Sequence, residues 1–174
     1  LRLFQENGFH ATGIDRIVAE SGVAKMTLYK HFKSKDELIL AALRRRDEEF
    51  RNWFMRAVES RAATPRERLV AIYDVLEEWF ADSRFKGCTF INASSEFGDK
   101  DDPVHATCAE HKHLVLGFVR DLAAAAGAKD PAILAMGLTM LMEGAVVMSH
   151  VAGRTDAARR AGQSAEVLIG QALQ

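Results

Sequence analysis

The sequence predicts an all-α protein of about nine helices, in which an N-terminal three-helix head with a helix-turn-helix precedes a C-terminal helical bundle. Apolar residues recur at spacings of three and four through most of the chain, which is the periodicity of helices with one buried face. Strong helix starts stand at Thr64-Pro65 and Asp130-Pro131. No run of alternating β-branched residues indicates a strand. We expect the head to span residues 1–46 and the bundle residues 47–174.

The first two helices of the head are short. Residues 1–7 indicate the end of a helix that stops at Gly8, and because the chain opens inside this pattern without an initiating Met, we expect further residues upstream of Leu1. Thr12 is predicted to be the N-cap of a second helix over residues 13–20. The apolar stripe of this helix consists of Ile14, Ile17 and Val18.

A tight turn at Ser21-Gly22-Val23 separates the second helix from a third one over residues 25–32. Leu28 and Phe32 lie four residues apart, so we expect both to be buried and to anchor the third helix. Their expected contacts are Leu3, Ile14 and Ile17. Two short helices joined by such a turn form a helix-turn-helix, whose second helix enters the major groove of DNA.

The bundle is expected to begin with a long helix that Ser34 caps and that reaches Arg61, with Glu37 in the capping-box position. A helix of this length can connect two domains. The remaining helices should start near residues 65, 88, 104, 131 and 155.

The last two helices are predicted to form a homodimer. Residues 132–152 are apolar enough to suggest a membrane span, but Glu143 and His150 favour a buried helix in a bundle or dimer, so we predict no membrane partner. The final helix carries a narrow, coiled-coil-like seam of small and apolar residues, for which packing within one chain is the alternative. The seam consists of Ala158, Ala161, Ala165, Leu168, Ile169 and Ala172.

Charge is distributed unevenly along the chain. Residues 1–46 hold nine Lys and Arg against five Asp and Glu, a formal charge of +4, whereas the remaining residues carry −5. A basic head on an acidic body is typical of a protein that contacts phosphates at one end only. Two cysteines do not make a disulfide framework, and no signal peptide is visible, so we expect reduced thiols and a cytoplasmic location.

Many residues of the head form one continuous pattern. It consists of Leu3-Phe4, Gly8-Phe9, Thr12, Ile14-x-x-Ile17-Val18 and Gly22-Val23-Ala24-Lys25-x-Thr27-Leu28-Tyr29-x-His31-Phe32-x-x-Lys35-x-x-Leu38. This pattern resembles the TetR/AcrR family of bacterial transcriptional regulators over residues 1–46, with Met26 where Gly or Ser is frequent. The bundle matches only in helix count and in Gly87-Cys88 before a short helix. The resemblance implies a regulator, most often a repressor, that binds a palindromic double-stranded operator as a homodimer and is released by a small molecule.

The exposed side of the third helix supplies the expected base contacts. Lys25 could bond guanine O6 and N7 or only a phosphate, and Thr27 could bond a base or a phosphate. Met26 offers an apolar contact to a thymine methyl group. The alternative is that the lysines form a solvated surface only. The resemblance implies phosphate contacts from Thr12, Tyr29, His31 and Lys35. The complete predicted DNA-binding set is Thr12, Lys25, Met26, Thr27, Tyr29, Lys30, His31 and Lys35.

By the same resemblance, the bundle should hold a small-molecule effector pocket whose occupation shifts the heads through the long helix. The candidate lining consists of polar groups on apolar helices and of aromatic walls, although each aromatic residue taken alone is more typical of plain core. Glu143 is the most suggestive member, because an ionisable group on an apolar helix needs a partner, which could also lie across the dimer. The set is Trp79, Phe90, Asn92, Glu96, His113, Phe118, Met140 and Glu143.

A metal- or thiol-sensing regulator with the same head is the alternative function. His105, Cys108 and His111 recur at intervals of three with Glu110 and His113 nearby, although this spacing fits no zinc signature. Cys88 at a helix start could be a reactive thiol. We assign no metal and no cofactor. The sequence has no nucleophile elbow, phosphate loop or HExxH motif, which disfavours an enzyme.

Overall fold

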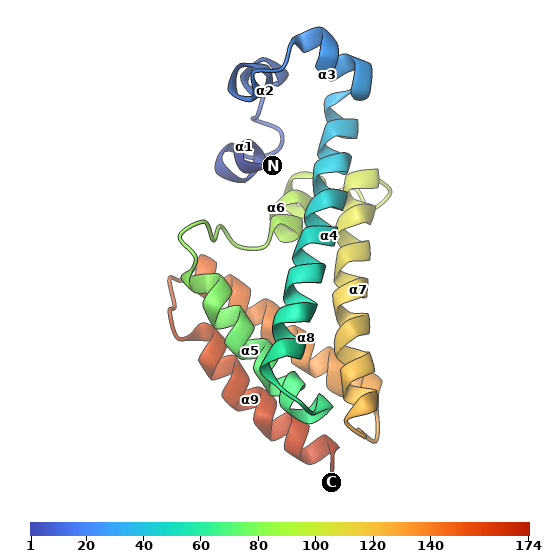
Figure 1. Ribbon diagram of the computed structural model, residues 1–174, viewed down its shortest axis with the longest axis vertical. Coiled ribbons are helices and arrows are strands. Elements are labelled where there is room, and N and C mark those ends of the chain that lie inside the picture. Colours follow the sequence, from blue (N-terminus) through green and yellow to red (C-terminus); the bar gives the residue numbers. More distant parts are fainter. The chain divides into compact units, whose positions relative to one another are not determined.

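The computed structural model describes residues 1–174 and contains nine α-helices and no strand (Figure 1). The predicted fold class is therefore confirmed. The helices are α1 (Arg2–Asn7), α2 (Ile14–Ser21), α3 (Lys25–His31), α4 (Lys35–Arg61), α5 (Pro65–Ala81), α6 (Thr89–Glu96), α7 (Pro103–Ala125), α8 (Pro131–His150) and α9 (Ala157–Ala172).

Several predicted helix starts and stops are present as local hydrogen bonds and turns. The Thr64 hydroxyl accepts from the backbone N–H of Glu67 at 3.3 Å, and the Glu67 carboxylate accepts from the N–H of Thr64 at 3.1 Å, which is a capping box. The Asp130 carboxylate caps α8. Gly8 and Gly22 end α1 and α2 with φ of 88° and 67°, a region that favours glycine.

The chain forms two compact units. The head unit consists of residues 1–49 and 88–111, and the body unit consists of residues 50–87 and 112–174. A single division after residue 46, as the sequence predicts, does not capture this arrangement. The reason is that α6 and the start of α7 pack with the N-terminal helices: the Gln5 amide, for example, donates to the Thr89 hydroxyl at 2.7 Å.

Aromatic rings form much of the core of the head unit. Phe4 and Phe9 stack with ring centroids 5.2 Å apart, and Phe97 meets Phe9 edge-on at 6.4 Å. Leu28 and Phe32 are only half-buried, so the expectation that they are buried anchors is wrong. Phe32 borders an open hollow of about 430 Å³, lined also by Leu1, Leu38, Ala41, Ala42, Arg45, Arg46 and Glu49, and therefore lacks close neighbours on that side.

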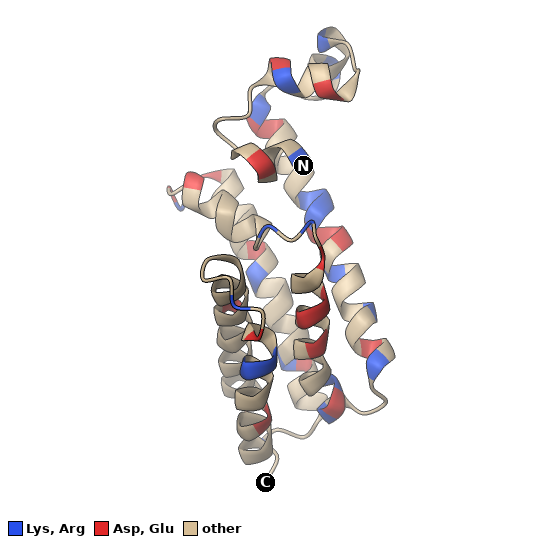
Figure 2. Cartoon of the chain, turned by 90° about the vertical axis from the view of Figure 1, so that its left-hand side faces the viewer, with Lys and Arg blue, Asp and Glu red and all other residues tan.

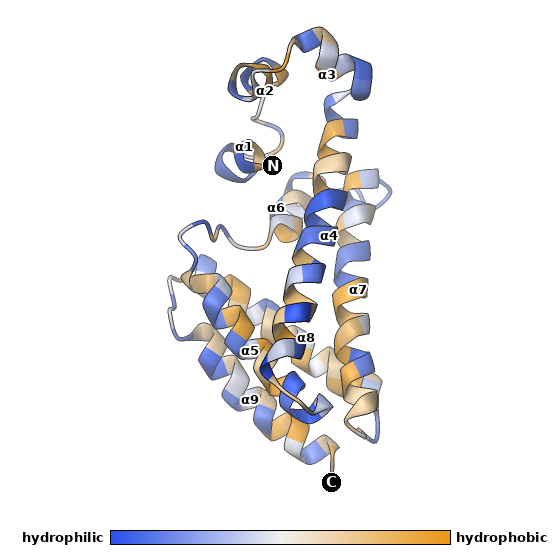
Figure 3. Ribbon diagram, viewed as in Figure 1, coloured by the Kyte–Doolittle hydropathy of each residue, from blue (hydrophilic) through white to orange (hydrophobic).

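In the body unit, α9 packs against α5 and α8. Apolar and polar residues alternate along the turns of α5 and α9, as in helices with one buried side (Figure 3). The Tyr73 hydroxyl donates to the Leu138 carbonyl at 3.0 Å, and burial raises the pKa of this phenol, which therefore remains a donor. A Cβ at Gly162 would lie only 3.1 Å from the Cβ of Tyr73, so α5 and α9 approach closely because position 162 has no side chain.

Most residues of the predicted α9 seam are buried by other residues of the same chain. Ala158, Ala161, Ala165 and Ile169 are buried in the core of the body unit, so their assignment to a surface between two chains is wrong. Their small size serves the close packing of α9 on α5 and α8 instead. A different set of apolar side chains on the last two helices is exposed. We call it the α8–α9 apolar surface: Ile133, Met136, Met140, Val147, Met148, Val151, Val167 and Leu168.

By length and composition, α8 alone could cross a membrane. Its inward side chains, among them Leu138 and Met142, are nevertheless buried in the core of the body unit. The Glu143 carboxylate also accepts a hydrogen bond from the Lys112 ammonium at 2.7 Å. Because the core helix of a bundle meets the same criterion, this single helix does not indicate a membrane protein.

Candidate nucleic-acid interface

Helices α2 and α3 form a helix-turn-helix with an exposed second helix. The left-handed backbone of Gly22 ends α2, and α3 begins three residues later at Lys25. None of the α3 side chains is fully buried: Met26 is 86% exposed and Tyr29 is 44% exposed. Thr27, Lys30 and His31 are exposed as well. The predicted base- and phosphate-contacting side chains of α3 therefore lie together on one accessible helix.

Charges of both signs are interleaved along the helix-turn-helix (Figure 2). The Lys25 ammonium donates to the carboxylate of Asp15 in α2 at 2.7 Å. This hydrogen bond and the attraction of the Asp15 charge raise the pKa of Lys25, which stays protonated. Sequence reasoning missed this pair, because a separation of ten residues across a turn follows no helical period.

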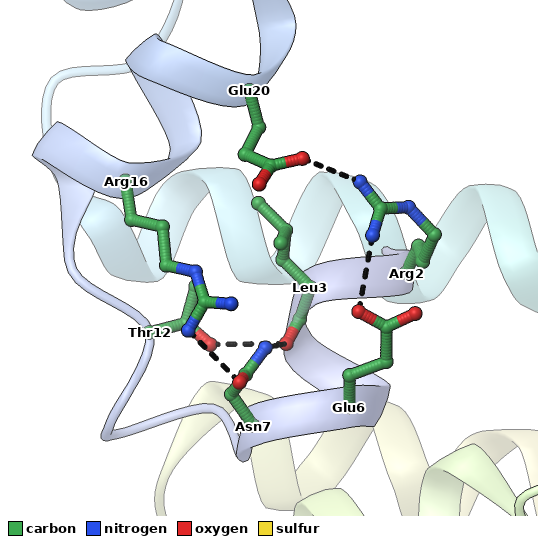
Figure 4. Close-up of polar contacts among 7 residues, drawn as sticks. All are labelled: Arg2, Leu3, Glu6, Asn7, Thr12, Arg16 and Glu20. Atoms are coloured by element: carbon green, nitrogen blue, oxygen red, sulfur yellow. Dashed lines mark hydrogen bonds and ion pairs between the residues drawn. The ribbon is translucent and has the colours of Figure 1, made fainter.

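Thr12 has a different position from the one predicted. Its side chain is fully buried, and its hydroxyl lies 3.2 Å from the Leu3 carbonyl (Figure 4). The hydroxyl donates to the Gly8 carbonyl at 2.6 Å. The N-cap of α2 is Gly13, without a side-chain cap. The prediction that Thr12 caps α2 is thus wrong, and its hydroxyl is not exposed to a phosphate. Thr12 instead fixes the loop between α1 and α2.

Polar contacts join α1 to α2 around this loop (Figure 4). Arg2 bonds Glu6 of its own helix at 3.0 Å and Glu20 of α2 at 2.7 Å. Arg16 donates to the Asn7 side-chain oxygen at 2.9 Å. These exposed contacts pair two arginines of the basic head with side chains of the same chain.

Glu96 and Lys35 hold the same loop from other helices. The Glu96 carboxylate accepts from the backbone N–H of Phe9 at 2.8 Å and from that of His10 at 2.7 Å. The Lys35 ammonium donates to the His10 carbonyl at 2.8 Å. The sequence assigned Glu96 to an effector pocket, but in the structure it belongs to the head unit and holds the α1–α2 loop.

Replacing Glu96 with Gln is expected to loosen this loop. The amide keeps one oxygen acceptor and turns an NH₂ group toward a backbone N–H, so we expect a loss of about 1–3 kcal/mol of stability. Hydrogen exchange of the Phe9 and His10 amides should accelerate. Ser95→Ala is the matched control, because the Ser95 hydroxyl donates only within its own helix, to Ile91. Unchanged exchange in Glu96→Gln would contradict the assigned contact.

Comparisons with known proteins agree with this geometry. Residues 1–42 match the family model described as bacterial regulatory proteins, tetR family, and residues 65–165 match the tetracyclin repressor-like C-terminal domain. The chain belongs to the TetR family. Members of this family are DNA-binding transcriptional regulators and not enzymes.

One solved structure and two curated regulators match the chain over different lengths. The regulator SCO4454 from Streptomyces coelicolor is 30% identical, with a TM-score of 0.91 over 99% of this chain and 91% of that one. The HTH-type regulator YjdC of Escherichia coli is 24% identical over 144 residues, 83% of this chain and 75% of YjdC. The activator FasR of Mycolicibacterium smegmatis is 51% identical over 43 residues, 25% of this chain and 20% of FasR.

The predicted TetR effector-pocket residues are divided between the two units. Phe90, Asn92 and Glu96 belong to the head unit, where Phe90 stacks on His111 with centroids 3.7 Å apart. The other members belong to the body unit. There Trp79 packs against aromatic rings of its own unit, and His113 is exposed. Phe118 meets Phe54 edge-on.

One hollow of the body unit contains a predicted effector residue. It lies between α8 and α9 and has a volume of about 550 Å³, which is within the range of small-molecule sites. Met140, Leu141 and Met148 form its apolar wall, and Arg154 and Arg160 line it as well. Glu143 is not among its lining residues.

The histidines and cysteines that suggested a metal- or thiol-sensing regulator do not form a metal site. His105 Nδ1 lies 2.8 Å from the Phe97 carbonyl, and His111 Nδ1 lies 2.7 Å from an Asp47 carboxylate oxygen. No group of three or more His, Cys, Asp or Glu side chains is placed to hold a metal ion. The side chains of Cys88 and Cys108 are both buried, which restricts access to either sulfur.

Proposed function

We propose that this TetR-family protein is a repressor that binds a palindromic operator as a homodimer and leaves it when a small molecule binds. The observation that carries the DNA-binding part is the exposed α3, with Lys25 through His31 accessible. A regulator acts on the chromosome, so we also propose a cytoplasmic location.

Two kinds of DNA contact are proposed for α3 and its neighbour. Lys25, Met26 and Thr27 would meet base edges, since the first residues of a recognition helix point into the major groove. Phosphate contacts would come from the exposed flanks and from the start of α4. The residues proposed to contact phosphates are Tyr29, Lys30, His31 and Lys35.

The α8–α9 apolar surface supports the dimer. Seven large apolar side chains of α8 and α9 are exposed, together with Val151 directly after α8, and an exposed apolar surface is typical of a protein-protein contact. A second copy of the chain fits it best, because a twofold pair of heads would match two half-sites about 34–36 Å apart. We therefore propose that the last two helices form the dimer through the α8–α9 apolar surface and not through the predicted seam of α9.

The effector is proposed to bind the body unit, and the α8–α9 hollow is assigned to the dimer instead, because Met140 and Met148 line it and also belong to the α8–α9 apolar surface. Ligand binding can release DNA only if the ligand has a higher affinity for the conformation that does not bind DNA. Thermal unfolding of the full chain in the presence of candidate small molecules would identify an effector. A compound that stabilises the protein should then lower its affinity for the operator.

The proposal is tested by selecting duplexes from a random DNA library and measuring binding over a range of salt concentrations. We expect a palindromic consensus bound by two chains, with affinity falling steeply as salt rises because condensed counterions are released. Failure to select any sequence would contradict specific DNA binding. Selection of a single unpaired half-site would contradict the dimer.

Tyr29→Phe and Thr27→Ala should have different effects on DNA binding. Loss of the Tyr29 hydroxyl removes a proposed phosphate contact, so affinity should fall about equally for all sequences. Thr27→Ala should relax the preference at one base position by about 1–3 kcal/mol. Binding to the operator and to single-base variants measures both effects. A changed base preference in Tyr29→Phe would refute its assignment as a phosphate contact.

A further inference from the structure

An exposed ion pair lies within the helix-turn-helix. The Lys25 ammonium and the Asp15 carboxylate are 2.7 Å apart, and their side chains are 55% and 86% exposed. Ion pairs as exposed as this contribute little to stability. The pair is therefore accessible to a ligand, and it presents a hydrogen-bond donor directly beside an acceptor.

The donor and acceptor pattern of this pair matches a G·C base pair. In the major groove guanine presents two adjacent acceptors, O6 and N7, and its partner cytosine presents the N4 amino donor. An ammonium only donates and an ionised carboxylate only accepts. An A·T pair fits less well, because its single donor is flanked by acceptors on both sides, which would repel the carboxylate.

We propose that Lys25 and Asp15 together recognise one G·C base pair in each half-site. Lys25 donates to guanine O6 and N7, and Asp15 accepts from cytosine N4. This assignment rests on the proposed function, because it requires α3 to lie in the major groove. It adds Asp15, a residue of α2, to the residues that determine base preference.

The same carboxylate reduces binding to DNA of any sequence. Asp15 offsets the positive charge of Lys25 and repels phosphates, so it lowers the electrostatic attraction that all duplexes share. Removing it should therefore have two opposite effects: tighter binding to unrelated DNA and weaker discrimination at the G·C pair. A residue that merely supports the fold would not raise affinity for unrelated DNA.

The test combines protein variants with altered bases. The full-length chain is titrated with its selected operator and with duplexes in which one cytosine is replaced by the pyrimidinone analogue that lacks the N4 amino group. At one pair in each half-site, the unaltered protein should lose about tenfold in affinity. Asp15→Ala should lose nothing further there. Equal losses in both proteins at every position would overturn the proposal.

Two further variants sharpen the result. Asp15→Asn should shift the preference at this pair toward A·T, because an amide both accepts and donates and can pair with adenine N6 and N7. Glu49→Ala is the matched control, since it removes the carboxylate of another exposed pair at 2.7 Å, with Arg45 in α4. It should change affinity uniformly. If Glu49→Ala relaxed the same base preference, the assignment to Asp15 would fail.

Failure of this inference is distinguishable from failure of the proposed function. A chain that selects a palindrome but shows no dependence on Asp15 at any G·C pair refutes the inference alone. A chain that selects no duplex refutes the proposed function and the inference with it. Thermal unfolding of each variant verifies that the exposed substitutions leave the fold unchanged.

Discussion

Met140→Glu is expected to convert the dimer into monomers and to lower operator affinity about 100-fold or more. Met140 is 66% exposed and lies within the α8–α9 apolar surface. A carboxylate there would have to lose its hydration without a partner when two copies meet. A monomer then binds one half-site and loses the gain of about 10²–10⁴ that two linked heads provide. Sedimentation equilibrium and binding to full and half operators measure the two effects.

Leu114→Glu is the matched control for this change. Leu114 is an exposed apolar residue of α7 in the same body unit, but it lies outside the α8–α9 apolar surface. The same carboxylate at this position should leave the dimer and the operator affinity unchanged. A dimer that persists in Met140→Glu, or dissociates equally in Leu114→Glu, would show that the proposed surface is wrong.

Phe54→Ala is expected to lower the free energy of unfolding by about 3–5 kcal/mol. Phe54 is almost completely buried in the core of the body unit, stacked on Phe50 with centroids 5.7 Å apart and edge-on to Phe118 at 6.1 Å. Truncation leaves a cavity that these rings cannot close without losing their own contacts. Urea denaturation at one fixed protein concentration measures the change, because dimerisation makes stability depend on concentration.

The adjacent residue provides the control for the core assignment. Trp53 lies in the same helix but is 41% exposed. Trp53→Ala should therefore lower the free energy of unfolding clearly less than Phe54→Ala, although it removes a larger side chain. The contrast tests which side of α4 faces the core of the body unit. A greater loss for Trp53→Ala than for Phe54→Ala would contradict the described packing.

Helix identities and their boundaries could be predicted because the signals are local. The capping box at Thr64, the Asp130-Pro131 start and the glycine at position 22 each act within a few residues. The helix-turn-helix was predictable for the same reason, whereas the phosphate contacts of Tyr29 and His31 were expected only from the resemblance to the TetR family.

The candidate site was only partly predictable, because several of its contacts join residues far apart in the chain. Glu96 lies 87 residues from Phe9, whose N–H it binds, and its helix carries no mark of that role. Thr12 is a residue type that is frequent at helix N-caps, but its hydroxyl donates to the Gly8 carbonyl at 2.6 Å and lies 3.2 Å from the Leu3 carbonyl. Local pattern cannot decide between two nearby partners for one hydroxyl.

By itself, the sequence determined the helical class, the position of the helix-turn-helix and the basic head, since each depends on residues within a turn or two of each other. Only the tertiary structure decided that Ala158, Ala161 and Ala165 pack inside the chain, that other apolar side chains remain exposed, and that Asp15 meets Lys25. A helical period shows that a side is apolar, but not which neighbour covers it. Which neighbour covers an apolar side depends on how the other helices pack.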